Sequence, residues 1–291
     1  MANERRVALV TGASRGVGRA IAVSLAKVGF DVVVSARTLK EGDGFDVSHD
    51  GSMRALPGSI ESTVDAVRAE GREALAVAMD LADPLSIGLA VGRVLEAWGH
   101  VDVLVNNAIY TGRGAQASVL DLSLADLRQE IDVDIVAPLT LISLLVPAMV
   151  ERGKGTVLNV TSAVAYVDPL DMGSYGVGYA VGKAGLFKAA GILAVELGDR
   201  GLRAYNVHPG FIRTERMELH VADQEGLDLS HAAPPEVCGA VVAWLADDPT
   251  DDPPRNGTLV ESQQFCAARG LVEGWPAPKP APAPAPPPKP R

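Results

Sequence analysis

A glycine-rich turn between an apolar run and an amphipathic segment most limits what this chain can fold into. The run at residues 7–10 predicts a buried parallel strand, and the apolar residues after the turn recur at helical spacing as far as Gly29. Between them, residues 11–18 carry glycines spaced G-x-x-x-G-x-G. Backbone N–H groups of such a turn, with a helix N-terminus behind it, can bind a pyrophosphate. The pattern therefore favours a nucleotide-binding α/β fold over an ordinary tight turn.

Tyr179 and Lys183 form the second informative pattern, because a spacing of four places both side chains on one face of a helix. A free phenol has a pKa of about 10 and transfers protons poorly at neutral pH. The ammonium group of a nearby lysine favours the phenolate and lowers the pKa of the phenol, which makes it a useful general acid or base. The pair therefore indicates proton transfer beside the nucleotide site.

Further motifs follow the glycine turn in one order along the chain. They are Asn106-Asn107-Ala108 after a predicted strand at 101–105, Ser162 after a predicted strand at 156–161, Tyr179 with Lys183, and the Pro209-Gly210 turn before residues 211–214. Taken together, and in this order, they resemble the short-chain dehydrogenase/reductase family over about residues 5–265. The resemblance implies an oxidoreductase that transfers a hydride between a nicotinamide cofactor and a carbonyl or alcohol substrate.

The distribution of apolar segments predicts a single α/β domain, because strands and helices alternate from end to end. We expect a Rossmann-type, doubly wound domain with a mostly seven-stranded parallel sheet flanked by helices, over residues 1–270, with a polar loop inserted at 38–58. The predicted strands are 7–10, 31–35, 74–79, 101–105, 156–161, 203–208 and 258–264. The predicted helices are 17–28, 60–70, 87–98, from Ser123 to about 150, through Lys183 to 197, and 236–245.

Cofactor choice is predicted from charge. Ala36 stands at the end of the second predicted strand, where enzymes that prefer NAD place an acidic residue for the ribose 2′-hydroxyl. Arg37 follows it and Arg15 lies in the glycine turn, and two guanidinium groups suit the 2′-phosphate of NADP. We therefore expect NADP(H) to be preferred over NAD(H), unless Arg37 only faces the carboxylates of the 41–50 segment.

The resemblance also assigns roles to individual residues. Ser162 orients the substrate carbonyl by a hydrogen bond, Tyr179 donates the proton, and Lys183 supports the phenolate and binds the nicotinamide ribose. Thr161 and Ser174 are alternative hydroxyl groups for the role of Ser162. The expected cofactor-binding residues are Gly12, Ser14, Arg15, Gly16, Val17, Gly18, Arg37, Asp80, Leu81, Asn107, Ala108, Tyr179, Lys183, Pro209, Gly210, Ile212 and Thr214.

Asp134 departs from the family pattern, which usually has an asparagine at this position. That asparagine helps to hold a water molecule that links the lysine to bulk solvent. An aspartate can accept the same hydrogen bonds but, when ionised, cannot donate any. It can also pair with Lys183 and compete for the charge that activates Tyr179. We include Asp134 among the candidate catalytic residues and expect the enzyme to stay active.

Composition excludes several other functions. The net charge of −10 disfavours nucleic acid and anionic membranes as partners. Cys238 and Cys266 lie far apart without a metal-ligand spacing, so we expect no metal site and a reducing compartment. The first six residues lead directly into the first predicted strand, so we expect no secretory signal and a cytoplasmic location. The apolar run at 135–150 is short for a membrane span, which needs about twenty residues, and is expected to be a buried helix. A homodimer or homotetramer is expected from the apolar helix that carries Lys183.

The Pro/Ala/Lys-rich segment at 271–291 is expected to be a disordered, extended tail, either without an enzymatic role or as a docking arm for a partner that binds polyproline. Two other functions remain open for the domain itself. It could be an epimerase or dehydratase that retains its cofactor, or a non-catalytic NADP-binding interaction protein. Residues 214–234 leave little room for a large sugar-nucleotide domain, which favours the hydride-transfer reaction.

Overall fold

The computed structural model describes residues 5–47, 53–112, 114–115, 117–168, 170, 176–221, 228–247 and 252–275. The strands are β1 (Val7–Thr11), β2 (Asp31–Ala36), β3 (Phe45–Val47), β4 (Met53–Ala55), β5 (Ala74–Ala78), β6 (Val103–Asn106), β7 (Gly155–Val160), β8 (Leu202–His208) and β9 (Leu259–Glu261). The helices are α1 (Gly16–Lys27), α2 (Ile60–Ala69), α3 (Pro84–Trp98), α4 (Leu124–Ile131), α5 (Ala137–Glu151), α7 (Val177–Leu197), α8 (Glu215–Val221), α9 (Pro235–Ala246) and α10 (Ser262–Arg269).

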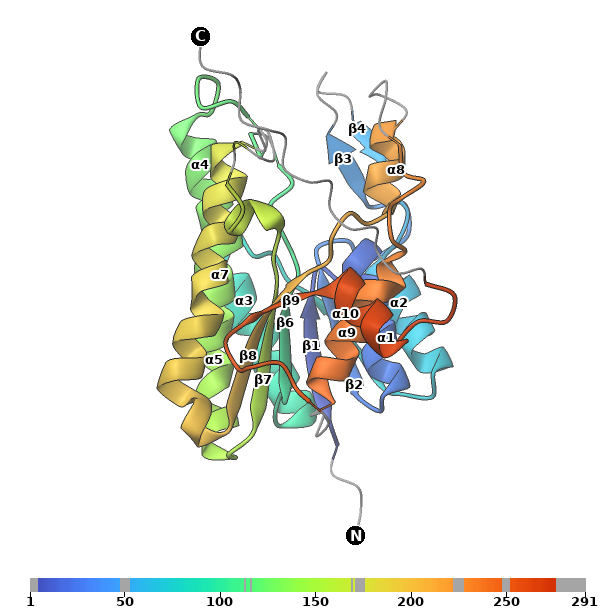
Figure 1. The fold of residues 1–291 in the computed structure, drawn as a ribbon, viewed down its shortest axis with the longest axis vertical. Coiled ribbons are helices and arrows are strands. Elements are labelled where there is room, and N and C mark those ends of the chain that lie inside the picture. Colours follow the sequence, from blue (N-terminus) through green and yellow to red (C-terminus); the bar gives the residue numbers. More distant parts are fainter. Residues whose placement is uncertain are drawn as a thin grey trace.

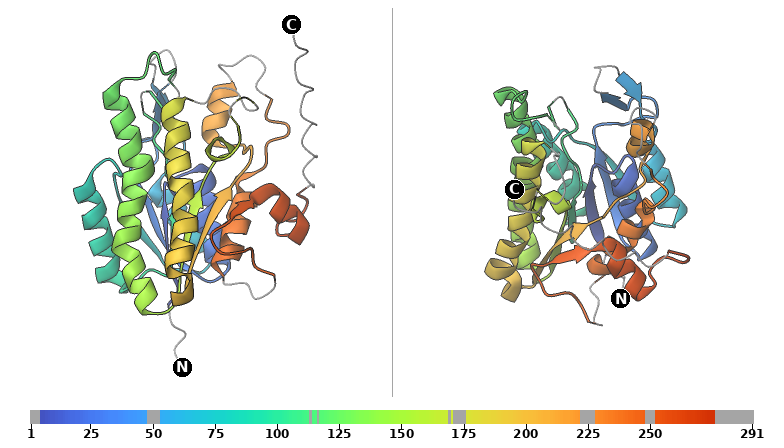
Figure 2. Two further views of the ribbon diagram at one scale, coloured as in Figure 1. Left: turned by 60° about the vertical axis from the view of Figure 1, so that its left-hand side comes forward. Right: turned by 45° about the horizontal axis from the view of Figure 1, so that its top comes forward.

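Seven parallel strands form one sheet in the order β5-β2-β1-β6-β7-β8-β9. The interior strand β1 is entirely buried, and its Val10 lies opposite Val34 of β2 and Val105 of β6. Such buried, mostly apolar strands are typical of parallel sheets that are covered on both faces. Helices α1, α2 and α9 cover one face, and α3, α5 and α7 cover the other (Figure 1). Figure 2 shows the second layer from outside, with these three helices side by side. The predicted doubly wound α/β fold is confirmed.

Helix starts follow capping chemistry where the sequence supplies it. At α2, Ser59 and Ser62 form a reciprocal capping box. At α3, the side chain of Asp83 accepts a hydrogen bond from the Leu85 N–H, so this helix starts three residues before its predicted start at residue 87. Helix α1 has no side-chain cap and no acidic residue in its first turn. Of these three helices, α1 alone has no side chain that caps the N–H groups of its first turn. These N–H groups are therefore available to an external anion.

The last predicted strand, 258–264, is wrong in its second half. Strand β9 pairs with β8 only over residues 206–208 and 259–261, and the chain then turns into α10. The reason is packing against α9: Cys266 is buried, and the ring of Phe265 lies 5.0 Å from that of Trp244. Gly270 ends this helix in the left-handed conformation at φ 60°.

The polar segment at 38–58 is more ordered than the plain loop expected from its composition. Strands β3 and β4 pair as an antiparallel hairpin, and Leu56 behind them is buried. The hairpin lies beside α8, an element that was not predicted (Figure 1). The guanidinium of Arg216 on α8 lies 3.4 Å from the carboxylate of Asp46, and Arg54 donates to the carbonyl of Leu219. These contacts join two segments that are distant in the sequence.

A π-helix at Asp132–Val136 joins α4 to α5, so that residues 124–151 form one helical stretch. This stretch is long and apolar enough to cross a membrane by length and composition alone, and half of its most apolar window is buried inside the protein. The predicted apolar run at 135–150 lies within it. Its Leu141 and Leu145 pack in the core against α3 and the sheet.

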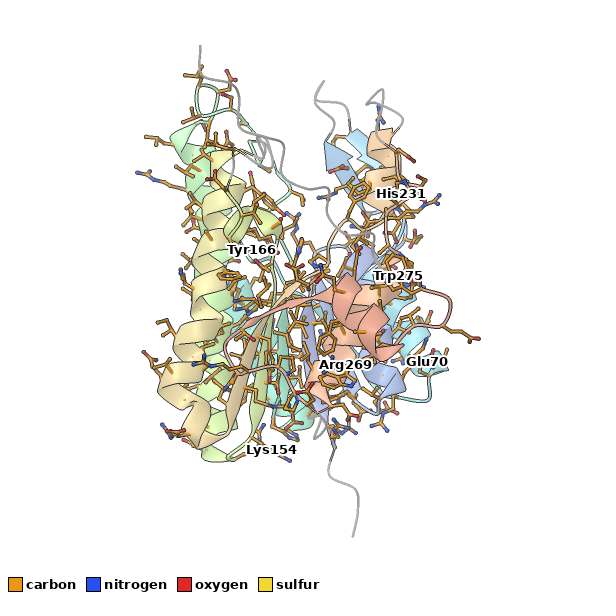
Figure 3. The ribbon with its side chains drawn as sticks, in the orientation of Figure 1. Glu70, Lys154, Tyr166, His231, Arg269 and Trp275 are labelled. Atoms are coloured by element: carbon orange, nitrogen blue, oxygen red, sulfur yellow. The ribbon has the colours of Figure 1, made fainter. Side chains whose placement is uncertain are left out.

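The described residues beyond position 270 still contact the core. Leu271, Val272 and Trp275 are partly buried and pack against the core cluster that contains residues of α9 (Trp275 is labelled in Figure 3). The remainder of the predicted tail, 276–291, lies outside the described residues.

Candidate functional site

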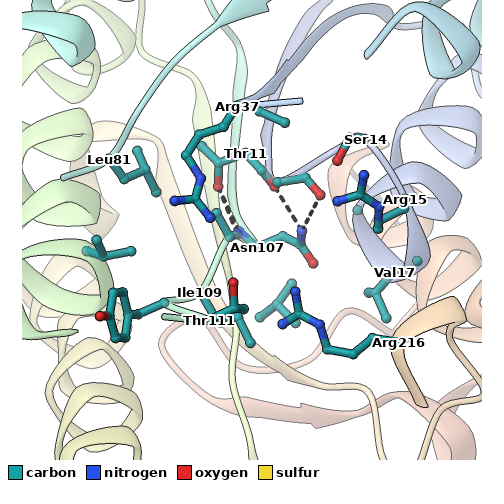
Figure 4. A pocket seen from close by; sticks show the side chains of 18 of the residues that line it. Thr11, Ser14, Arg15, Val17, Arg37, Leu81, Asn107, Ile109, Thr111 and Arg216 are labelled. Atoms are coloured by element: carbon teal, nitrogen blue, oxygen red, sulfur yellow. Dashed lines mark hydrogen bonds between the residues drawn. The ribbon is translucent and has the colours of Figure 1, made fainter. Parts of the chain in front are cut away.

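A cavity of about 320 Å³ opens at the carboxyl ends of β1, β2, β5, β6 and β7. It lies where the strand order reverses between β1 and β6, the usual ligand position in open α/β sheets. Figure 4 shows side chains from distant parts of the chain around it. Its lining includes the predicted residues Gly12, Ser14, Arg15, Gly16, Val17, Gly18, Arg37, Asp80, Leu81, Asn107, Ala108, Tyr179, Lys183, Pro209 and Thr214.

The glycine turn lines one half of this cavity. Gly12 and Gly16 have φ of +64° and +53°, which other residues rarely adopt. At Gly18 a Cβ would overlap the carbonyl oxygen of Gly12 and lie 2.5 Å from the Asn107 Nδ2. Only a glycine fits there, and it lets the start of α1 approach the turn closely.

Asn107 and Thr11 hold the turn in place. Asn107 Nδ2 donates to the carbonyl oxygens of Thr11 and Gly12, at 2.8 and 3.2 Å (Figure 4). Thr11 Oγ1 accepts from the N–H groups of Asn107 and Ala108, at 3.0 and 3.1 Å, and donates to the Val105 carbonyl. The Asn-Asn-Ala motif therefore supports the turn structurally, while its Asn107 and Ala108 also line the cavity.

Positive charges gather at the end of the cavity beside β2. Arg37 lines it directly, and Arg216, which sequence reasoning missed, lines it from α8 (Figure 4). Burial lowers the pKa of Arg216; Asp46 opposes this shift, and the charge of Arg37 adds to it. Arg15 also lines the cavity, but its guanidinium donates to the carbonyl oxygens of Pro57 and Gly58, both at 2.7 Å.

The first turn of α1 already attracts an anion. The carboxylate of Glu215 accepts a long hydrogen bond of 3.4 Å from the N–H of Gly16. A helix N-terminus favours negative charge, and here a carboxylate from α8 supplies it. The partial positive charge of the helix N-terminus and the geometry of the glycine turn fit a pyrophosphate at this position. The flanking arginines fit further phosphate oxygens. The site therefore suits a dinucleotide.

Tyr179 and Lys183 line the other half of the cavity from α7. The Nζ of Lys183 lies 5.9 Å from the centre of the Tyr179 ring and donates to the carbonyl of Val160 at 2.9 Å. The lysine is 4% exposed. Burial lowers its pKa, and the carboxyl group of Asp134 opposes that effect. The structure thus brings phenol and ammonium together as the spacing predicted.

Four predicted residues lie outside the cavity lining, and Asp134 is one of them. Ser162 lies two residues after the end of β7 and precedes a short 3₁₀ turn, whereas its neighbour Thr161 does line the cavity. Gly210 packs against Gln263, and Ile212 is 6% exposed and bridges to Ala233. The remaining alternative hydroxyl, Ser174, lies outside the described residues.

Asp134 lies in the π-helix behind Tyr110 and Lys183 and is 3% exposed. Its Oδ1 accepts the N–H of Tyr110 at 2.6 Å. Burial raises the pKa of Asp134, and the Lys183 charge and the Tyr110 N–H oppose this. Asp134 therefore faces the lysine from behind and is not among the cavity-lining residues.

Several lining residues could not be found from motifs. Thr11, Tyr110, Thr111, Glu215 and Arg216 reach the cavity through the fold. Thr11 ends the buried strand β1, which is a signal that the sequence does carry. Tyr110 and Arg216 lie in segments with no recognisable periodicity. Among the described residues, no group of three or more His, Cys, Asp or Glu side chains is placed to hold a metal ion.

Comparison with known proteins is consistent with this architecture. The family model for short chain dehydrogenase matches residues 6–45 and 52–225. The chain is 30% identical to a 3-oxoacyl-[acyl-carrier-protein] reductase of Synechocystis, over 92% of this chain and 97% of that protein. It is 31% identical to an L-rhamnose 1-dehydrogenase (NAD(P)(+)) of Sphingomonas (84% and 90% covered) and 30% identical to a cyclohexanol dehydrogenase of Rhodococcus (84% and 91%).

A solved structure described as a short-chain dehydrogenase/reductase from Burkholderia xenovorans superposes with a TM-score of 0.71. The two chains are 25% identical, and the match covers 88% of this chain and 94% of the other.

Proposed function

The chain belongs to the short-chain dehydrogenase family, and on this premise we propose that it transfers a hydride between NADP(H) and the carbonyl or alcohol group of a small molecule. One observation carries the proposal. A single cavity has a glycine turn and arginines at one end and the Tyr179–Lys183 pair at the other. That arrangement combines a dinucleotide cradle with a proton-transfer pair.

Tyr179 is the proposed proton donor during carbonyl reduction. Its O–H bond breaks as the substrate oxygen becomes an alkoxide, and the proton ends on that oxygen. The Lys183 ammonium near the ring favours the phenolate that remains. In alcohol oxidation the same phenolate accepts the proton. Ser162, or Thr161 in its place, donates the hydrogen bond that orients the substrate oxygen.

The nicotinamide cofactor, when bound, supplies or accepts the hydride, and the protein supplies position and charge. Lys183 has a proposed second role on the nicotinamide ribose. The side chain of Lys183 is held in one direction by its burial and by its hydrogen bond to the Val160 carbonyl. The proposed function is tested by following NADPH absorbance with a panel of ketones, sugars and alcohols. Turnover would support it, and cofactor binding without turnover on any class would instead favour the non-catalytic alternative.

Arg37 should determine the preference for NADP. We expect Arg37→Ala to weaken NADPH binding about tenfold or more and to change NADH binding little. A hydrogen bond to a charged group contributes on the order of 1.5–3 kcal/mol, and about 1.4 kcal/mol is tenfold in affinity. The measurement is a fluorescence titration of parent and variant with both cofactors.

The exposed Arg93 on α3 offers a matched control, because it lies away from the cavity. Arg93→Ala should leave both affinities unchanged. Equal losses for NADPH and NADH in Arg37→Ala would show that Arg37 does not read the 2′-phosphate.

We also propose that the catalytic domain includes the packed residues 271–275 and that 276–291 is a separate tail. Deleting 276–291 should leave the melting temperature and KM unchanged. Deleting 271–291 also removes the packing of the partly buried Leu271, Val272 and Trp275 against the core. Their burial contributes about 1–3 kcal/mol each at most, so we expect a drop of several degrees. A lower melting temperature in the shorter deletion would show that the tail packs on the domain.

The proposed homo-oligomer, a dimer or tetramer, would pair through the outer faces of α5 and α7. Leu139 and Leu144 on α5 and Val181, Ile192 and Val195 on α7 are exposed apolar side chains. Light scattering of the purified protein measures this state directly.

A further inference from the structure

Two buried carboxyl groups lie one helical turn apart behind the site, and only one of them has a role so far. Glu130, in the last turn of α4, is 0% exposed, and Asp134, in the π-helix, is 3% exposed. Residues four apart on a helix face the same side, and the charge of Asp134 acts on Glu130. Glutamate is almost never fully buried unless it is paired.

Three of their four carboxyl oxygens have no hydrogen-bond partner within the described part of the chain. These are both oxygens of Glu130 and the Oδ2 of Asp134. The remaining oxygen, Oδ1 of Asp134, accepts the Tyr110 N–H. A buried ionised carboxylate without donors carries a large desolvation cost, whereas a protonated one does not.

Helix α7 is shaped to receive this pair. A Cβ at Gly178 would overlap the Oε2 of Glu130, and a Cβ at Gly182 would lie 3.2 Å from the Oδ2 of Asp134. These two glycines directly precede Tyr179 and Lys183 in the sequence. The carboxyl groups therefore lie against the same helix segment that carries the proposed proton-transfer pair.

The charges that face the pair do not allow both carboxyl groups to ionise easily. Lys183, from α7, acts on Asp134 and can balance one negative charge. Tyr110, from the segment after β6, is uncharged at neutral pH, and burial, Asp126 and Glu130 all raise its pKa. Burial and the charge of Asp134 raise the pKa of Glu130 to about 7. The first turn of α7 favours a negative charge but supplies no hydrogen bond to either group.

We propose that Glu130 and Asp134 hold one proton between them at neutral pH, and that Glu130, a positioning residue acting through Asp134, sets the electrostatic pull of Lys183 on the Tyr179 phenol. The first half of this proposal stands without the proposed function, and the second half rests on it. Two interacting carboxyl groups titrate as a pair, so loss of the shared proton adds a second negative charge behind Lys183. That charge opposes the ammonium's effect on the phenol.

The shared proton is tested by thermal unfolding as a function of pH. The pKa of Glu130 is higher in the folded protein than in the unfolded chain, where it is about 4.3. Ionisation of Glu130 therefore destabilises the folded protein: this cost is absent below about pH 4, grows toward pH 7 and is constant above. Glu130→Gln cannot ionise. We therefore expect the melting temperature of Glu130→Gln, relative to that of the parent, to rise by at least about 3 °C between pH 5 and pH 8.

Glu96 on α3 is exposed and gives the matched control. Glu96→Gln should follow the parent at every pH. Glu130→Leu is a second test that does not place an amide in the buried site. Its melting temperature relative to the parent should rise with pH in the same way, because leucine also lacks the charge. A difference between Glu130→Gln and parent that does not change from pH 5 to pH 8 would overturn the shared proton.

The coupling to Tyr179 is tested by pH–rate profiles for alcohol oxidation, which needs the phenolate. Glu130→Gln should move the rising limb of kcat to lower pH by roughly half a unit, because the second charge never appears. Asp134→Asn should move the limb in the same direction. The double variant should shift by less than the sum of the two, since both act through one charge pair.

The outcomes separate the two proposals. An enzyme without turnover on any substrate would refute the proposed function, while the unfolding data would still decide the shared proton. A gain in melting temperature with an unmoved pH–rate profile would keep the shared proton and overturn the action on Tyr179. A purely structural role for Glu130 would change the melting temperature equally at all pH values.

Discussion

Tyr179→Phe should lower kcat by about 10²–10⁴-fold and leave NADPH affinity nearly unchanged. The substitution removes only the transferable proton, and general acid–base catalysis contributes rate factors of this size. The phenyl ring keeps the volume that lines the cavity and its position 5.9 Å from the Lys183 ammonium. Steady-state turnover and a cofactor titration on the same preparation measure the two effects separately.

Tyr205→Phe is the matched control for this substitution. Tyr205 is buried in β8 and donates to the Pro254 carbonyl, away from the cavity lining. It should lose some stability but keep its turnover. Full activity in Tyr179→Phe would refute the assignment of the proton donor, and a large loss of NADPH affinity would show that the hydroxyl group contacts the cofactor.

The sheet could be predicted from the sequence because its signals are local. Residues 7–10 and 103–105 are continuous apolar runs, and each is bounded by polar residues. The exceptions have a tertiary cause. Residues 262–264 join α10 because Phe265 and Cys266 pack on α9, a contact that no local pattern shows. The β3–β4 hairpin likewise depends on α8, which is more than 150 residues away.

The cavity was predictable in part for the same reason. The glycine turn, Asn107 and the Tyr179–Lys183 pair are motifs with fixed spacing, and the fold places all of them around one cavity. Arg216 reaches it only because α8, which follows the Pro209-Gly210 turn, lies beside the cavity. Arg15 was expected to be available for phosphate, but its guanidinium is engaged by two backbone carbonyls, and these contacts appear only in three dimensions.

Glu130 shows where sequence reasoning ends. A glutamate near the end of an amphipathic helix is normally a solvated residue, and nothing in the local pattern marks it as buried. Its burial depends on Gly178 and Gly182, about fifty residues later, which let α7 approach α4 and the π-helix closely. Only the packing of the two helices reveals a carboxyl group enclosed beside Asp134.

Lys183→Met should lower turnover by at least about 10²-fold and also destabilise the protein at neutral pH. Methionine keeps most of the side-chain volume but removes the bond to the Val160 carbonyl and the cation that faces Asp134. Removing one partner of a buried charge pair costs about 3–5 kcal/mol. Cofactor affinity should fall as well, because the proposed contact with the ribose is lost.

The pH dependence of this loss follows from Asp134. Lys183 lowers the pKa of that carboxyl group against the raising effect of burial, so Lys183→Met raises it further. At acid pH, Asp134 then stays protonated and does not destabilise the folded protein. As the pH rises, it ionises and becomes a buried charge without a partner. The destabilisation should therefore be small near pH 5 and large near pH 8. Melting curves of parent and variant across this range measure it.

The double variant Lys183→Met/Asp134→Asn separates structure from catalysis. It removes the stranded carboxylate, so it should recover most of the melting temperature at pH 8 but none of the turnover. A double variant as unstable as Lys183→Met would show that the Val160 hydrogen bond, and not the pairing with Asp134, is what the lysine contributes to folding. Restored turnover would contradict a catalytic role for the ammonium, because the phenol would then act without a neighbouring cation.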